Sequence, residues 1–242
     1  MKTIIFARRN LKEMLNDILS LFFMIVLPAF LLVLMVTLNK NIGLNETFAV
    51  ENFVPSIIIF SFPFSAMFSG VLVSRDRSNS FLARLFVSPL KAHHYIVGYM
   101  LPLLIISFIQ IIFLYIVGII LGLKISIYII VSLPFLVLIS FLFVNVGLLF
   151  GSTLKEQQVG GVGSIFIQFV AFLGGVWFPL EIVGGAFEIA GKILPFYHCI
   201  QLAQKTLAGN FQNVLLHTAI IIGYTILVAL LAIFSFKKKM IE

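Results

Sequence analysis

The chain has 242 residues, of which 61% are hydrophobic and only 10% are charged, whereas a soluble domain carries roughly 25% charged residues. This composition excludes a soluble domain. The net charge of +7 does not indicate nucleic-acid binding, because the basic residues are scattered between apolar runs. The single cysteine, Cys199, excludes an internal disulfide. We therefore expect one all-α domain of membrane-spanning helices.

After a short basic N-terminal segment, six apolar stretches reach the length of about 20 residues that crosses a bilayer core. The first is too long for the apolar region of a signal peptide and has no cleavage pattern after it, so it is expected to remain as a span. Two glycine pairs, Gly118 with Gly122 and Gly147 with Gly151, allow close helix packing, either within the subunit or at a dimer seam. The six expected spans are residues 19–38, 53–73, 96–121, 127–150, 159–178 and 214–236.

The basic residues predict the orientation of these spans. Twelve of the 16 lysines and arginines lie before the first span, between spans two and three, after span four or at the C-terminus. Lys40, Lys124, Lys192 and Lys205 lie in the opposite loops. Because Lys and Arg concentrate on the cytoplasmic side, both termini are expected there.

None of the six spans carries Asp, Glu, Lys or Arg near its middle, which argues against an ion-coupled transporter or an intramembrane hydrolase. No catalytic residue and no metal site are predicted, and the adjacent His93 and His94 would point to different faces of a helix. The polar span residues Gln110, Asn145 and Gln168 are candidates for a translocation path, with interhelical hydrogen bonding as the alternative.

The segment between spans two and three, SRDRSNSFLARLFVSPLKAHHY, contains a predicted amphipathic helix over residues 77–87. Ser78 or Ser80 is a plausible N-cap, and Pro89 ends the helix. Such a helix could float at the membrane surface or dock onto a soluble partner. There is no G-x-x-x-x-G-K-[ST] motif in the chain, so ATP could drive this protein only if another polypeptide binds it.

Two motifs in order, R-D-R-x-x-x-x-x-A-R-L-x-x-x-P-L after span two and W-F-P-L-E at the end of span five, resemble the permease subunits of type-2 ABC exporters. The resemblance covers essentially the whole chain, so residues 1–242 are expected to form a single permease domain. Ser78, Asn79 and Ser80 stand where the family often has an E-x-E-x-G-T version.

The resemblance implies an amphipathic interfacial helix at residues 2–17, carrying Arg8, Arg9 and Lys12. It also implies a coupling helix that sits in a cleft of a separate nucleotide-binding ATPase, with ATP and Mg on that partner and no cofactor in this chain. A second permease subunit, identical or paralogous, would complete the transporter. The implied coupling residues are Arg75, Asp76, Arg77, Phe81, Arg84, Leu85, Phe86 and Pro89.

The resemblance also implies a re-entrant hairpin on the outer face, with helices expected at residues 180–193 and 196–207 and a C-cap at Gly209 and Asn210. The hairpin is either an outer gate or a passive cap. The gate candidates are Trp177, Phe178, Pro179 and Glu181.

The expected function is therefore that of a membrane-spanning permease subunit of an ATP-binding cassette exporter in a bacterial plasma membrane. A passive channel or facilitator and a non-transporting scaffold or immunity protein are the alternatives. The cargo stays open between a drug, a peptide, a lipid and a glycan.

Overall fold

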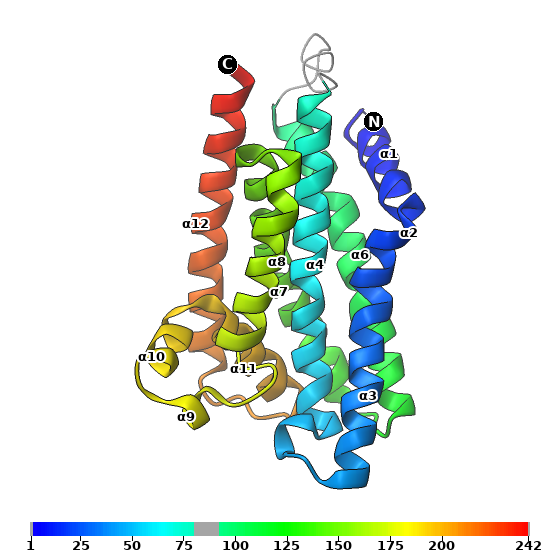
Figure 1. Cartoon of the computed structure of the whole chain (residues 1–242), viewed down its shortest axis with the longest axis vertical. Coiled ribbons are helices and arrows are strands. Elements are labelled where there is room, and N and C mark those ends of the chain that lie inside the picture. The colour runs from blue at the N-terminus through cyan, green and yellow to red at the C-terminus, as the bar shows by residue number, and fades with distance from the viewer. Residues whose placement is uncertain (1, 80–91, 242) are drawn as a thin grey trace.

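The computed structural model describes residues 2–79 and 92–241, and these residues form helices and connecting turns without a β-strand (Figure 1). The predicted all-α fold is confirmed. In chain order the elements are α1 Lys2–Asn16, α2 Ile18–Leu21, the π-helical turn η1 Phe22–Val26, α3 Leu27–Ile42, the 3-10 turn η2 Glu46–Phe48, α4 Val50–Ser78, α6 Ala92–Ile120, α7 Ile127–Thr153, α8 Glu156–Leu173, α9 Leu180–Val183, α10 Gly185–Ile193, α11 Pro195–Leu207 and α12 Val214–Ile241.

Within the described residues, five helical segments are long and apolar enough to cross a membrane: Ile18–Ile42, Val50–Ser78, His94–Ile120, Ile127–Thr153 and Val214–Phe236. The remaining expected span coincides with α8, which begins with Glu156 and two glutamines and ends at Leu173. The prediction placed its end five residues later, but Gly175 takes a positive φ of 82° and turns the chain toward the hairpin. The polytopic membrane fold is confirmed, and the sixth crossing stays a prediction.

The helix α4 is the centre of the bundle. It packs against α3, α6, α7, α8 and α11, and most of its apolar side chains are buried, whereas α12 and the first span leave most of theirs at the surface. Such exposed side chains include Phe30 and Leu230. Since lipid tails are as apolar as these side chains, a bilayer can cover them without cost.

Glycines bring α4 and α7 close together. A Cβ atom at Gly147 would lie 2.1 Å from the Ser69 Oγ and 2.7 Å from the Ala66 carbonyl oxygen, and one at Gly151 would lie 2.5 Å from the Cβ of Val73. The pair Gly147 and Gly151 therefore serves packing within the chain, which is one of the two roles that the sequence left open.

The first span differs from the single regular helix that was predicted. Asp17 separates α1 from α2 and caps α2 by accepting a hydrogen bond from the Ser20 amide. The π-helical turn η1 follows, and there the carbonyl of Met24 accepts a hydrogen bond of 2.8 Å from Gln110 Nε2 of α6. A π-helical turn interrupts the regular hydrogen bonding of an α-helix and frees backbone carbonyls. Gln110 donates to the carbonyl that is freed at Met24.

The hairpin after α8 is also more broken than predicted. The expected helix at residues 180–193 is split into α9 and α10, because Gly184 adopts φ 65° and ψ −167°, a conformation open only to glycine. The second expected helix is confirmed as α11. Its end is a Schellman motif, in which the Asn210 amide donates to the Lys205 carbonyl and Gly209 takes a φ of 70°.

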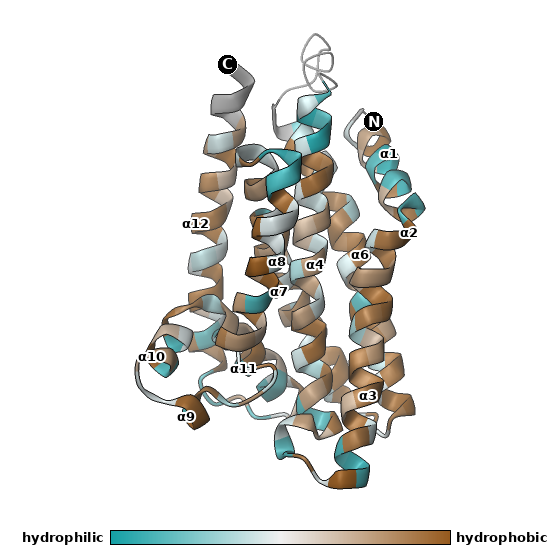
Figure 2. Ribbon diagram, in the orientation of Figure 1, coloured by the Kyte–Doolittle hydropathy of each residue, from teal (hydrophilic) through white to brown (hydrophobic). Residues whose placement is uncertain are grey.

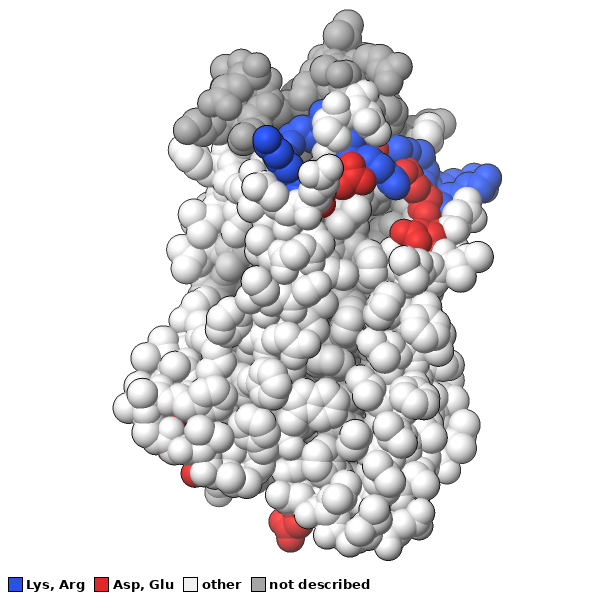
Figure 3. Space-filling view, viewed as in Figure 1, with Lys and Arg blue, Asp and Glu red and all other residues white. Residues whose placement is uncertain are grey.

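Charge is unevenly distributed along the bundle. The start of α1, the end of α4 and the end of α12 lie at one end, and α9, α10 and α11 lie toward the other (Figure 1). Hydrophilic residues lie toward both ends of the bundle, while the long helices are mostly hydrophobic along their middles (Figure 2). Figure 3 shows Lys and Arg gathered at the first of these two ends on this face of the molecule. This is the end that the sequence predicts to be cytoplasmic, and we call it the basic end.

Candidate functional site

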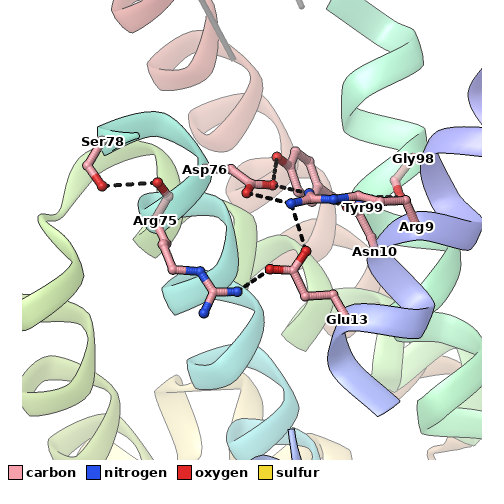
Figure 4. A network of polar contacts seen from close by, with 8 residues as sticks. All are labelled: Arg9, Asn10, Glu13, Arg75, Asp76, Ser78, Gly98 and Tyr99. Carbon is pink, nitrogen blue, oxygen red and sulfur yellow. Dashed lines mark hydrogen bonds and ion pairs between the residues drawn. The ribbon is translucent and has the colours of Figure 1, made fainter. Parts of the chain in front are cut away.

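At the basic end, ion pairs join α1 to the last turn of α4 (Figure 4). Arg9 of α1 faces Asp76 of α4, with its Nη1 2.6 Å from Oδ2 and its Nη2 3.1 Å from Oδ1. Glu13, one turn further along α1, lies 2.7 Å from Arg9 Nη2 through one oxygen and contacts Arg75 of α4 through the other. We call these four residues, Arg9, Glu13, Arg75 and Asp76, the α1–α4 clamp.

Asp76 is the buried member of the clamp. It is only 3% exposed, and it also accepts a hydrogen bond of 2.7 Å from the Tyr99 hydroxyl of α6. A buried carboxylate is tolerated when it is paired and hydrogen-bonded, and removing one of its partners is costly. The clamp therefore fixes α4 to both α1 and α6.

The remaining face of α1 explains how Arg9 comes to this position. Phe6 packs edge-on against the rings of Tyr95 and Tyr99 and fills the space above Gly98, where a Cβ atom would lie 2.3 Å from the Phe6 ring. The buried Asn10 donates a hydrogen bond of 3.1 Å to the Gly98 carbonyl. Packing against α6 thus sets the rotation of α1 and directs Arg9 toward α4.

Electrostatics reinforce the pair. Burial acts to lower the pKa of Arg9, but the hydrogen bond and charge of Asp76, with the charge of Glu13, outweigh it and raise that pKa above its ordinary value. Hydrogen bonds between two charged groups are about twice as strong as neutral ones. Arg9 therefore remains a cation throughout the physiological pH range.

A second set of contacts joins the same turn of α4 to α7. Arg77 donates hydrogen bonds to the carbonyl oxygens of Ser152 and Leu154, and Ser74 Oγ donates to the Leu154 carbonyl at 3.0 Å. The last carbonyls of a helix lack helical partners and carry partial negative charge, so a guanidinium stabilises them. Through the clamp and Arg77, one turn of α4 is attached to α1, α6 and α7.

The sequence placed the start of a separate coupling helix at residue 77, and this is wrong. Residues Arg75 to Ser78 are the last turn of α4, because the contacts above hold that turn in helical form. Ser78 is not an N-cap, since its Oγ donates to the Arg75 carbonyl at 3.0 Å. The other predicted coupling residues, Phe81, Arg84, Leu85, Phe86 and Pro89, and the alternative N-cap Ser80 lie outside the described residues.

A comparison with protein families identifies this architecture. The family model described as "ABC-2 type transporter" matches residues 1–208. The chain belongs to the ABC-2 type transporter family. It is also 23% identical over 245 residues to the protein named "Putative transport permease YvfS" from Bacillus subtilis (strain 168), with 95% of each chain covered. The resemblance seen in the sequence is confirmed, and the ABC-2 type chain is a transport permease rather than an enzyme.

The polar candidates for a path through this ABC-2 type permease lie in different surroundings. Gln110 is fully buried, where it donates to Met24 and accepts a hydrogen bond of 3.1 Å from Ser65 Oγ. Asn145 is buried and donates to the Phe141 carbonyl of its own helix. Gln168 is exposed on α8. The first two therefore act as hydrogen-bonding groups within the bundle, and a translocation role for any of the three stays a prediction.

Gln168 borders an apolar hollow in the described part of this ABC-2 type permease. The hollow has a volume of about 590 Å³ and lies between α8 and the hairpin. Its other walls are almost entirely aliphatic and aromatic, so it offers contacts to an apolar group and one amide to a polar one. Its lining includes Ile165, Phe169, Phe172, Phe178 and Phe187.

The gate candidates are divided between two surfaces. Trp177 packs at a tilt against the ring of Phe53 and edge-on against the ring of Phe60, both on α4, with ring centroids 6.0 Å and 5.6 Å away. Phe178 turns toward the apolar hollow. Pro179 precedes α9 and is half-buried, while Glu181 is exposed and lies 3.5 Å from Lys192. Trp177 anchors the hairpin to α4, and whether the hairpin gates stays a prediction.

Sequence reasoning missed Glu13, Asn10 and Tyr99. Two features of the sequence are consistent with the clamp. Arg9 and Glu13 stand four residues apart, which is ion-pair spacing on a helix, and Asp76 is the one acid between two arginines at the end of a span. An acid in that position needs a cation from another segment, and the basic N-terminal segment is the candidate.

Proposed function

We propose that this ABC-2 type permease is the membrane-spanning subunit of an ATP-driven exporter, and that a separate ATPase chain binds Mg-ATP and docks at residues 75–89. The α1–α4 clamp is the observation that carries the proposal. It attaches the last turn of α4, which is the first part of the predicted docking segment, to α1 through Arg9 and Glu13 and to α6 through Tyr99.

This arrangement suits the transmission of force. A force applied to the chain after Ser78 would act on a turn of α4 whose side chains contact α1, α6 and α7. A displacement of α4 would therefore also displace these three helices. Because α4 is the central helix and also packs against α8 and α11, its displacement would change the packing along the whole bundle. Closure of a pair of ATPases on ATP would then bias the permease between two arrangements.

The remaining parts of the proposal follow from the family and from the surface. Two permease subunits, identical or paralogous, would face each other, with both termini in the cytoplasm of a bacterial cell and the hairpin on the outer face. The apolar hollow beside α8, with Gln168 at its border, supports an amphipathic or lipid-like cargo. An antibiotic, an apolar peptide, a lipid and a lipid-linked glycan all meet that description.

Site-specific photo-crosslinking in the native host tests the partner and its docking place together. One variant carries a photoreactive phenylalanine at Phe86, and the matched control carries it at Phe211, which is exposed at the opposite end of the bundle. The proposal predicts that position 86 captures an ATPase with a Walker motif and that position 211 does not.

Two outcomes would contradict the proposal. Capture of the ATPase at position 211 instead of position 86 would place the docking site at the end of the bundle opposite the basic end. Capture of no ATPase at either position, in cells that still transport a cargo through this chain, would favour a passive channel.

A further inference from the structure

A chain of hydrogen bonds through two buried histidines links the hairpin to α12. The Nδ1 atoms of His198 in α11 and His217 in α12 are 2.8 Å apart. His198 Nε2 lies 2.9 Å from the Lys192 carbonyl oxygen at the end of α10, and His217 Nε2 lies 3.4 Å from Lys205 Nζ. Both imidazoles are less than 10% exposed, at 8% and 6%. The chain thus joins α10, α11 and α12.

The two outer partners determine where the protons lie. A carbonyl oxygen only accepts, so His198 Nε2 must carry a hydrogen. An ammonium group only donates, so His217 Nε2 must be bare. With both rings neutral, His217 Nδ1 then donates to the bare Nδ1 of His198. One pair of tautomers satisfies every contact, and it runs in one direction from Lys205 to the Lys192 carbonyl.

We propose that His198 and His217 form a proton-sensitive latch, closed when both rings are neutral, which releases the hairpin from α12 when either ring binds a proton. A proton on His217 would place an N–H opposite the Lys205 ammonium. A proton on His198 would place N–H groups on both Nδ1 atoms, or force His217 into the tautomer that faces Lys205. In every protonated form, two hydrogen-bond donors therefore face each other, either at the two Nδ1 atoms or between His217 Nε2 and Lys205 Nζ.

The other ionisable groups around the pair do not remove this conflict. Lys192 of α10 is paired with Glu188 and Glu181, and Tyr224 of α12 donates to the Ile193 carbonyl at 2.9 Å. The ring of Tyr197 lies edge-on to His198 at 5.6 Å. On the helices that pack against α11, the first turns of α4 and α7 at this end carry Glu51 and Tyr128.

Burial supports the neutral state at physiological pH. It lowers the pKa of His198, and this effect outweighs the hydrogen bond to the Lys192 carbonyl, which acts in the opposite direction. Because burial lowers this pKa, opening of the latch requires a pH below the ordinary pKa range of histidine. The latch is independent of ATP, of the docking segment and of the cargo, so it stands or fails separately from the proposed exporter function.

Nitrogen NMR of the purified full-length protein, labelled with 15N-histidine and held in nanodiscs, tests the closed state. The chain has four histidines, and single His→Gln variants assign the signals. Near pH 8, the proposal predicts His217 with its hydrogen on Nδ1 and His198 with its hydrogen on Nε2. The opposite tautomer at either residue, or a charged ring there at that pH, would overturn the proposal.

Trp177 reports on the opening, because it is the only tryptophan and it joins the hairpin to α4. Between about pH 8 and about pH 4, its emission should change in the wild type and in the His94→Gln control at the basic end. The change should vanish in the His198→Gln/His217→Gln double variant. In Lys205→Met the change should also be lost, because a hydrogen on His217 Nε2 then faces no opposing ammonium group. A flat wild-type response, or an unchanged response in the double variant, would refute the latch.

Discussion

The pair of Arg9 and Asp76 gives the sharpest test of the clamp. Asp76→Asn keeps the size of the side chain but removes its charge and replaces one acceptor oxygen by an NH2 donor, so one of the two hydrogen bonds from Arg9 is lost and the other loses its anionic acceptor. Hydrogen bonds to charged groups contribute about 1.5–3 kcal/mol each. Because the Arg9 side chain is 36% exposed, water offsets part of that loss. We expect a coupling free energy of about 2 kcal/mol between the two residues.

The assay is a double-mutant cycle on apparent melting temperature. Cys199 is the only cysteine and is fully buried, so a thiol-reactive dye reports unfolding of the detergent-purified chain. For a protein of this size, 1 kcal/mol shifts Tm by about 2–4 °C. Asp76→Asn should therefore lower Tm by about 4–8 °C, and adding Arg9→Gln to it should cost much less than Arg9→Gln alone.

Arg8→Gln is the matched control. It removes the same charge from the next residue of α1, but its side chain is exposed, so it should leave Tm within about 1 °C, as surface substitutions do. Additivity of Arg9→Gln and Asp76→Asn to within about 0.5 kcal/mol would show that the two residues do not interact, and the clamp would then be wrong.

Three further variants test the packing. Gly147→Ala should lower Tm by several degrees through overpacking, whereas Gly160→Ala, with nothing within 4 Å of its added Cβ, should not; equal effects would contradict the close contact of α4 and α7. Gln110→Leu should lower the free energy of unfolding by about 1–3 kcal/mol, because the buried Met24 carbonyl loses its hydrogen-bond donor. An unchanged Tm would contradict the hydrogen bond between Gln110 and Met24. Gly209→Ala should lower the free energy of unfolding in the dye assay by more than about 1 kcal/mol, because its Cβ would also lie 2.5 Å from the Tyr128 ring, and a neutral result would contradict the positive φ of Gly209.

The sequence was sufficient for the spans but not for their ends. The lengths of the apolar stretches predicted the membrane-spanning parts of α6, α7 and α12 to within a few residues. Polar and charged groups are costly in lipid, so an uninterrupted apolar stretch marks a span clearly. The same criterion ended span two at residue 73, because the charged residues Arg75, Asp76 and Arg77 are typical of a loop. Their partners on α1, α6 and α7 are far away in sequence, and only the tertiary structure shows why the helix continues.

Local irregularities were equally hard to predict. The glycines of the hairpin predicted breaks, but not that Gly184 would divide the first helix into α9 and α10. The π-helical turn before α3 has no local signal, because the partner of its Met24 carbonyl is Gln110, which lies two spans later. The sequence singled out Gln110 as a path residue or an interhelical hydrogen-bonding group, but its partners Met24 and Ser65 depend on helix packing that one sequence does not reveal.

The most direct test of the exporter account is purification of the chain from its native host in mild detergent, with quantitative mass spectrometry of the proteins that remain bound. The account predicts a Walker-motif ATPase at near-equal stoichiometry, which is lost when Arg84 and Leu85 are both replaced by alanine while the permease itself stays folded. Recovery of the folded chain without any ATPase, or an ATPase that still binds the double variant at full stoichiometry, would contradict it.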